Sequence, residues 1–226
     1  MRVLAIDTAL EACSAALLDT HETALIASKS RPMTRGHAET LVPLIAEMMA
    51  QTTIDFSHID RFAVTTGPGS FTGLRVGIAA ARGMALAAGK PAVGLTTLAA
   101  LAAPLIAEDD KLAVAAAIDA RHDNVYLQVF GANGRTLVQP RLLSIAEAVR
   151  AASVEPMRLV GSGAALLAAA WPKNAAPLSV DARRAPDIAW VARLGAAAGE
   201  TSAPPKPLYL RAAEAHPQTA TLVPRR

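Results

Sequence analysis

The strongest constraint on this chain is an order of predicted elements that occurs twice. Three strands are followed by a helix, a strand and a helix. In the first half, apolar runs and alternating patterns predict them at residues 2–6, 12–19, 23–28, 37–50, 59–65 and 72–88. From residue 111 the order restarts, with elements predicted at 111–119, 124–130, 135–139, 144–152 and 158–160. The repeat indicates a duplicated βββαβα unit, and we expect an α/β fold with two lobes, residues 1–108 and 109–226.

Each half carries an aspartate near the end of its first strand. Asp7 and Asp119 both follow the dipeptide Ala-Ile. Ligands of open α/β sheets bind beyond the carboxyl ends of the strands, so two such units could form a cleft with an aspartate on each wall. Each aspartate could equally cap the turn after its strand, and the residues alone leave both interpretations open.

A glycine-rich segment, Thr-Gly-Pro-Gly-Ser-Phe-Thr-Gly-Leu-Arg, covers residues 66–75 between a predicted strand and a predicted helix. Ser70 or Thr72 can cap the helix, and the exposed amides at its start attract anions. The spacing is one residue too long for a dinucleotide-binding fingerprint, and the glycines could serve only to let the helix pack closely. The candidate nucleotide cleft consists of Asp7, Thr8, Gly67, Gly69, Ser70 and Asp119.

Two neighbouring helices, at residues 37–50 and 72–88, carry more apolar and small residues than one core contact requires. The second one places small residues at four-residue steps, which lets another element approach closely. This pattern favours a partner surface, with packing inside the domain as the alternative. The predicted interface residues are His37, Leu41, Ile45, Met48, Gly73, Gly77, Ala81 and Ala85.

Composition narrows the class of protein. Hydrophobic residues make up 52% and charged residues 18%, which is typical of a globular chain. The net charge is only +3 and the arginines are scattered, so we expect no strong RNA binding by the chain alone. Cys13 is the only cysteine, which suits a reducing compartment. The N-terminus is unlike a signal peptide and no uncharged stretch reaches the ~20 residues of a membrane span, so we expect a cytoplasmic protein.

The sequence offers no obvious catalytic constellation. His37 is followed four residues later by Leu41, and no two histidines lie one helical turn apart, so we predict no metal site. Ser70 lacks the flanking glycines of a nucleophile elbow. We expect neither a catalytic residue nor a cofactor.

These motifs together resemble the TsaB (YeaZ) family over nearly the whole chain. The most specific match is TTGPGSFTGLRVGIAAARGMA, and further matches are VLAIDTALEACSAALLD, RGHAETLVPLIAEM, GLTTLAALA, AIDARHDNVYLQVF and PLYLRAAE. The resemblance implies two RNase H-like lobes of the actin and Hsp70 (ASKHA) superfold.

The resemblance also implies a role. TsaB is similar to TsaD, the subunit that transfers threonylcarbamoyl to adenosine 37 of tRNAs reading ANN codons. The implied role is that of an accessory subunit that binds and activates TsaD through the helices matching residues 37–50 and 72–88. TsaE joins the pair, TsaC supplies the threonylcarbamoyl adenylate, and a homodimer forms when TsaD is absent. Contact with tRNA is expected mainly through the complex.

Two departures from enzymes of the superfold indicate that the chain itself is not catalytic. The histidine pair that holds the TsaD metal is missing, and no glycine follows Asp7 closely to admit phosphate; the nucleotide cleft would then be vestigial. One alternative is an ATP-dependent small-molecule phosphotransferase, with Asp7 and Asp119 flanking magnesium. A protease is disfavoured because no Ser-His-Asp order is visible.

Overall fold

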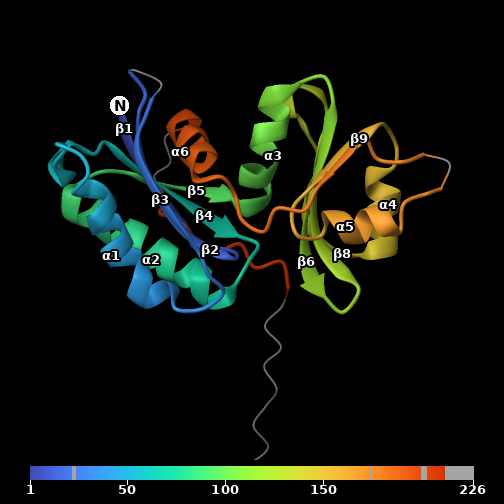
Figure 1. The fold of residues 1–226 in the computed structure, drawn as a ribbon, viewed down its shortest axis with the longest axis horizontal. Coiled ribbons are helices and arrows are strands. Elements are labelled where there is room, and N and C mark those ends of the chain that lie inside the picture. The colour runs from blue at the N-terminus through green and yellow to red at the C-terminus, as the bar shows by residue number, and fades with distance from the viewer. Residues whose placement is uncertain (22–23, 174, 200–202, 212–226) are drawn as a thin grey trace, which may run out of the picture.

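The computed structural model describes residues 1–21, 24–173, 175–199 and 203–211. Two five-stranded sheets lie on either side of a central pair of helices (Figure 1). The first sheet has the order β3-β2-β1-β4-β5, formed by β1 (Arg2–Asp7), β2 (Ala12–Asp19), β3 (Ala24–Pro32), β4 (Arg61–Gly67) and β5 (Ala92–Thr96). The second has the order β10-β9-β6-β7-β8, formed by β6 (Ala113–Arg121), β7 (Asn124–Phe130), β8 (Thr136–Ser144), β9 (Met157–Val160) and β10 (Ser179–Asp181).

The two sheets share one topology. In the first, β1 pairs antiparallel with β2 and parallel with β4. In the second, β6 pairs antiparallel with β7 and parallel with β9. Both first strands therefore lie in the middle of their sheets, which explains why they are continuous apolar runs rather than alternating ones. The expected duplicated unit and its two RNase H-like lobes are confirmed.

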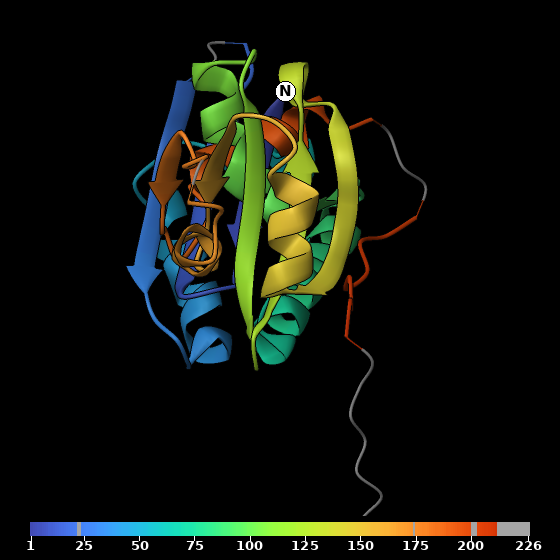
Figure 2. The same ribbon diagram turned by 90° about the vertical axis from the view of Figure 1, so that its right-hand side faces the viewer.

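Helices form three layers around the sheets. They are α1 (His37–Met49), α2 (Phe71–Ala88), α3 (Thr97–Glu108), α4 (Ile145–Ala152), α5 (Ala164–Ala169) and α6 (Ile188–Ala197), with short 3-10 turns at Phe56–His58 and Ala132–Gly134. The outer face of the first sheet is covered by α1 and α2 (Figure 1), and that of the second by α4 and α5 (Figure 2). Within the described part of the chain, no helix is both long and apolar enough to span a membrane.

The central helices α3 and α6 each cover the sheet of the other half of the chain. Side chains of α6, among them Ile188 and Val191, pack with Val3 and Ala5 of β1. Leu98 and Leu101 of α3 pack in one cluster with Val114 of β6. By packing, α6 therefore belongs to the first lobe, which differs from the expected division at residues 108 and 109. Each inner sheet face needs an apolar cover, and the chain supplies it by crossing over.

Two buried arginines hold the ends of these central helices. The Arg61 guanidinium donates to the carbonyls of Gly195 at 3.0 Å and Ala198 at 2.6 Å, at the end of α6. In the second lobe, Arg158 donates to the carbonyl of Asp109, the residue that ends α3, at 2.7 Å. A cation is favourable at a helix C-terminus, where carbonyl groups lack partners. Each arginine therefore attaches a crossing helix to the sheet beneath it.

We expect Arg61→Met to lower the free energy of unfolding by about 2 kcal/mol, because the substitution removes charged donors from buried helix-end carbonyls. Denaturant titration followed by circular dichroism measures the loss. Arg193→Met is the matched control, because Arg193 lies on the exposed side of α6, the helix whose end Arg61 contacts. It should change the free energy of unfolding by less than about 0.5 kcal/mol. Equal effects of the two substitutions would contradict this role of Arg61.

Candidate functional site

The Asp7 carboxylate lies inside the first lobe, with 0% of the residue exposed. Its Oδ1 accepts hydrogen bonds from Thr65 Oγ1 at 2.5 Å and from the Ala9 amide at 3.2 Å. Its Oδ2 is buried and has no hydrogen-bond partner among the described residues. Burial raises the pKa of Asp7 from 3.8 to about 6, although the Thr65 and Ala9 hydrogen bonds and the nearby His37 lower it.

The glycine-rich loop packs directly against the end of β1. The Thr8 hydroxyl donates to the Gly73 carbonyl at 2.7 Å, and the Ser70 amide donates to the Ala9 carbonyl at 2.7 Å. A Cβ atom on Gly69 or Gly73 would overlap with the Ala9 or Thr8 carbonyl oxygen. Ser70 caps α2 by accepting from the Gly73 amide at 3.3 Å. The glycines therefore serve close packing, the alternative that the sequence had left open.

Asp119 has a different environment. Its Oδ1 accepts from the Arg121 amide at 2.8 Å and its Oδ2 forms an ion pair with the Arg121 guanidinium at 3.3 Å. Its side chain is partly exposed. Both aspartates thus accept from the amide two residues later, as turn-capping residues do. No interaction among the described residues joins Asp119 to the group around Asp7.

The predicted nucleotide cleft therefore needs correction. The structure brings together Asp7, Thr8, Gly69 and Ser70 with the start of α2, but it buries Asp7 and Thr8 in the lobe. A carboxylate with no exposed surface cannot contact the phosphates or magnesium of a bound nucleotide. The arrangement also weakens the phosphotransferase hypothesis, which required Asp7 on a cleft wall.

The sequence analysis missed the counterpart of the glycine-rich loop in the second lobe. Gly161, Ser162 and Gly163 follow β9, just as the glycine-rich loop follows β4, whose last residue is Gly67. Gly161 and Gly67 have positive φ angles of 106° and 121°. The Ser162 hydroxyl accepts from the Asp119 amide at 3.1 Å. The repeat itself was the available signal, because a glycine loop is expected after the middle parallel strand of both units.

The C-terminal segment, residues 203–211, was also missed as a structured element. The Leu208 amide donates to the Thr66 carbonyl at 2.8 Å, at the end of β4. Further along, Arg211 donates to the Ala120 carbonyl of the second lobe at 3.1 Å. The segment has no regular structure, but it contacts both lobes. Its part after residue 211 lies outside the described residues.

The structure also corrects the predicted interface. All eight side chains or glycines face the interior of the first lobe, where they pack on the sheet. Gly77, for example, lies against Thr8 and Ile6, so the ridge of small residues allows α2 to approach β1 and β4. Packing inside the domain, the alternative to a partner surface, accounts for them. They are His37, Leu41, Ile45, Met48, Gly73, Gly77, Ala81 and Ala85.

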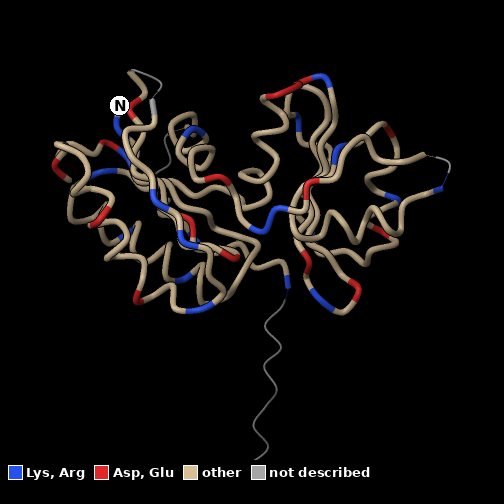
Figure 3. The backbone as a smooth tube through the Cα atoms, in the orientation of Figure 1, with Lys and Arg blue, Asp and Glu red and all other residues tan. Residues whose placement is uncertain are grey.

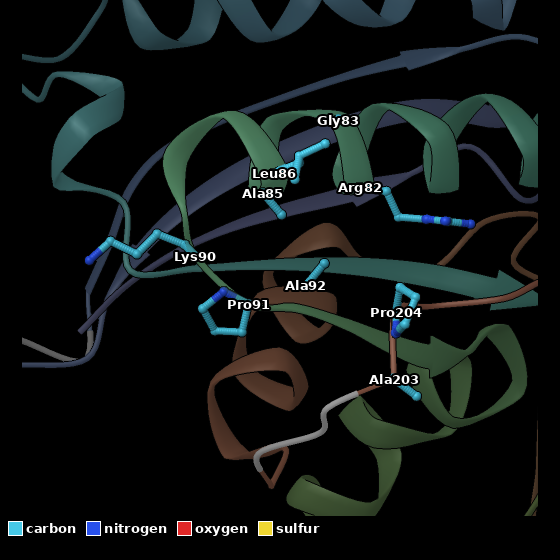
Figure 4. A pocket seen from close by; sticks show the side chains of 9 residues that line it. All are labelled: Arg82, Gly83, Ala85, Leu86, Lys90, Pro91, Ala92, Ala203 and Pro204. Atoms are coloured by element: carbon cyan, nitrogen blue, oxygen red, sulfur yellow. The ribbon is translucent and has the colours of Figure 1, made fainter.

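The opposite sides of the same helices form an exposed surface of small and apolar residues, here called the outer helical face. It comprises Ala38, Val42, Ala46, Ala79, Gly83 and Leu86. Val42 is 64% exposed and Leu86 is 85% exposed, although both are large apolar residues on regular helices. Beside it, a pocket of about 400 Å³ separates the C-terminal half of α2 from Pro204 (Figure 4).

Charged groups give no further site. Lys, Arg, Asp and Glu are scattered over both lobes (Figure 3). Within residues 1–21, 24–173, 175–199 and 203–211, no group of three or more His, Cys, Asp or Glu side chains could hold a metal ion. Of the three most exposed large apolar side chains among the described residues, two, Leu86 and Val42, lie on the outer helical face.

Comparisons with known proteins agree with this picture. The family model described as TsaD, tRNA N6-adenosine threonylcarbamoyltransferase, matches residues 30–216. The solved structure of YeaZ from Pseudomonas aeruginosa superposes with a TM-score of 0.77 at 30% identity, covering 92% of this chain and 99% of that one. The chain belongs to the TsaB (YeaZ) family. The resemblance seen in the sequence is thereby confirmed.

Curated members of the family are matched over part of their length. The tRNA threonylcarbamoyladenosine biosynthesis protein TsaB of Escherichia coli is 38% identical over 126 residues, which cover 56% of this chain and 53% of that protein. TsaB of Haemophilus influenzae is also 38% identical over 126 residues, 52% of its length. The chain thus spans about half the length of these curated TsaB relatives.

The buried Asp7 makes stability depend on pH. Below pH 3.8 the group is protonated in both states, whereas above about 6 the folded protein must hold a buried charge. Stability should therefore fall as the pH rises through this window, by about 3 kcal/mol from this residue. Asp7→Asn should remove that pH-dependent component. Between pH 4 and 7, the free energy of unfolding of the variant, measured by urea titration, should therefore rise relative to that of the wild type.

The matched control is Asp181→Asn. The hydrogen bond from the Arg183 side chain, aided by the Arg183 amide and charge, lowers the pKa of Asp181, so this carboxylate contributes stability that is lost as the pH falls. Its substitution should change the pH profile in the opposite direction. If wild type and Asp7→Asn show the same dependence of stability on pH, the Asp7 carboxyl does not bind a proton in the folded state as proposed.

Proposed function

We propose that this chain is the accessory subunit for N6-threonylcarbamoylation of adenosine 37 in tRNAs reading ANN codons. In this role it binds TsaD through the outer helical face and holds TsaD in its active form. TsaE joins the complex, TsaC supplies the activated threonylcarbamoyl group, and tRNA is bound mainly by the complex. The outer helical faces of two copies pair when TsaD is absent. The site of action is the cytoplasm.

Gly83 is the observation that carries this proposal. It lies inside α2, where glycine costs about 1 kcal/mol relative to alanine. A Cβ atom at this position would meet nothing within 4 Å, so its own chain does not require the glycine. Close approach by a helix of another chain does require a residue without a side chain. Gly83 thus marks where the partner comes nearest.

The neighbours of Gly83 support the same reading. Ala79 and Leu86 lie on the same side of α2, and Val42 and Ala46 lie on the exposed side of α1. Large exposed apolar side chains around small residues are typical of a helix-packing surface. The burial of Asp7 supports a non-catalytic role, since the aspartate that would bind magnesium in a phosphotransferase has no access to ligand.

We expect Gly83→Arg to abolish TsaD binding while leaving the fold intact. The long side chain blocks close approach by a partner. Its Cβ atom meets nothing of its own chain within 4 Å, and the loss of a helical glycine should raise helix stability by up to about 1 kcal/mol. Isothermal titration calorimetry with the TsaD of the same organism measures binding, and thermal unfolding measures the fold. Gly83→Ala is the matched control and should bind far better than Gly83→Arg. Unchanged binding by Gly83→Arg would exclude this surface.

Reconstitution tests the function itself. TsaC, TsaD, TsaE and unmodified tRNA are incubated with ATP, threonine and bicarbonate, with and without this protein, and the modified nucleoside is measured by mass spectrometry. We expect modification only when the protein is present, and only background with Gly83→Arg. Equal modification without the protein would refute the accessory role.

A further inference from the structure

Arg75 is fixed on the surface of α2 by two aromatic rings. Its guanidinium lies 3.7 Å from the centre of the Phe71 ring. Its Nε donates to the Tyr209 hydroxyl at 3.1 Å, and the Phe71 and Tyr209 rings stack with centres 5.5 Å apart. Tyr209 comes from the C-terminal segment, so residues 134 positions apart in the sequence build one cluster.

The cluster is exposed and ready to bind. Phe71 is 53% exposed and Tyr209 is 48% exposed. Among the described residues, no carboxylate forms an ion pair with Arg75, and its terminal nitrogens make no hydrogen bond. A guanidinium whose orientation is already fixed loses little entropy when it binds a carboxylate through two parallel hydrogen bonds.

The cluster continues the outer helical face. Arg75, Ala79 and Leu86 lie four and seven residues apart, so they follow one another along the same side of α2. A partner helix that covers Gly83 and Leu86 therefore reaches Arg75 and, through it, Tyr209. The charges of the two helices differ. Helix α2 exposes Arg75 and Arg82 and contains no Asp or Glu, so an acidic partner residue is favoured beside it. Helix α1 contains Glu39 and Glu47 and no Lys or Arg.

We propose that the partner surface is composite: the C-terminal segment contributes Tyr209, and the Arg75 held by Tyr209 and Phe71 binds a carboxylate on the partner helix. This inference rests on the proposed TsaD interface. A protein carboxylate is favoured over an RNA phosphate because Ala79, Gly83 and Leu86 on this face are apolar or small. Arg82 is the one further cation of α2, and phosphate affinity needs several cations on one surface. Arginine and tyrosine at such a position are typical of binding hot spots.

Binding of purified TsaD to the full chain tests the proposal by calorimetry. We expect about tenfold weaker binding for Arg75→Gln and for Tyr209→Ala, each equivalent to about 1.4 kcal/mol. Tyr209→Phe keeps the stacked ring and should lose about threefold. Because Tyr209 acts partly through Arg75, the double variant should lose clearly less than the hundredfold expected of independent residues. Arg150→Gln, on α4 of the other lobe, is the matched control and should bind as the wild type does.

The outcomes separate this inference from the proposed function. If Gly83→Arg abolishes TsaD binding while Arg75→Gln and Tyr209→Ala leave it unchanged, the composite surface is refuted and the interface on α1 and α2 stands. If none of the three variants affects binding, both proposals fail. Fluorescence anisotropy with labelled tRNA completes the test. Weaker tRNA binding by Arg75→Gln at unchanged TsaD affinity would show a phosphate contact and overturn the proposal.

Discussion

Two buried guanidinium groups connect the two halves of this molecule. Arg61 in β4 binds the carbonyls at the end of α6, and Arg158 in β9 binds those at the end of α3. Each helix comes from the other half of the chain and covers an inner sheet face that would otherwise expose apolar side chains. Because helix C-termini carry partial negative charge, the arginines stabilise the ends that leave the sheets. The central helical layer, and with it the relation between the lobes, depends on these contacts.

The first lobe has the features of a ligand-binding α/β unit, but it uses them for packing. In open sheets of this kind, ligands bind where strands end and helices begin. Here the Thr8 and Ala9 backbone occupies the space that Gly69 and Gly73 leave free, and Asp7 is enclosed at a raised pKa of about 6. The C-terminal segment adds Leu208 at the end of β4. In this geometry the Asp7 carboxylate has no exposed surface on which to meet a nucleotide.

Helix α2 combines two surfaces with opposite requirements. Towards the sheet, Gly73, Gly77 and Ala81 are small because β1 lies close behind them. Towards solvent, Gly83 is small although nothing in its own chain lies near. The first group explains how the helix packs, whereas no contact among the described residues requires a glycine at position 83. Small residues on the two sides of one helix are therefore separate signals, and the four-residue pattern in the sequence covered only the buried side.

Much of the architecture follows from the sequence alone. Apolar runs and turn residues predicted most strands of both sheets and α1, α2 and α4 to within about two residues, because strand and helix periodicities are local properties of the chain. The predictions for β3 and β8 ended four and five residues too early. The repeated Ala-Ile-Asp predicted the duplication. The glycine motif identified the family. The sequence analysis predicted no element at β10, α5 or α6. It also placed buried residues of α1 and α2 on a partner surface and put the buried Asp7 in a cleft. Which helix face meets the sheet, whether a strand-end carboxylate is buried and how Tyr209 reaches Arg75 depend on contacts between distant segments, and only the tertiary structure decides them.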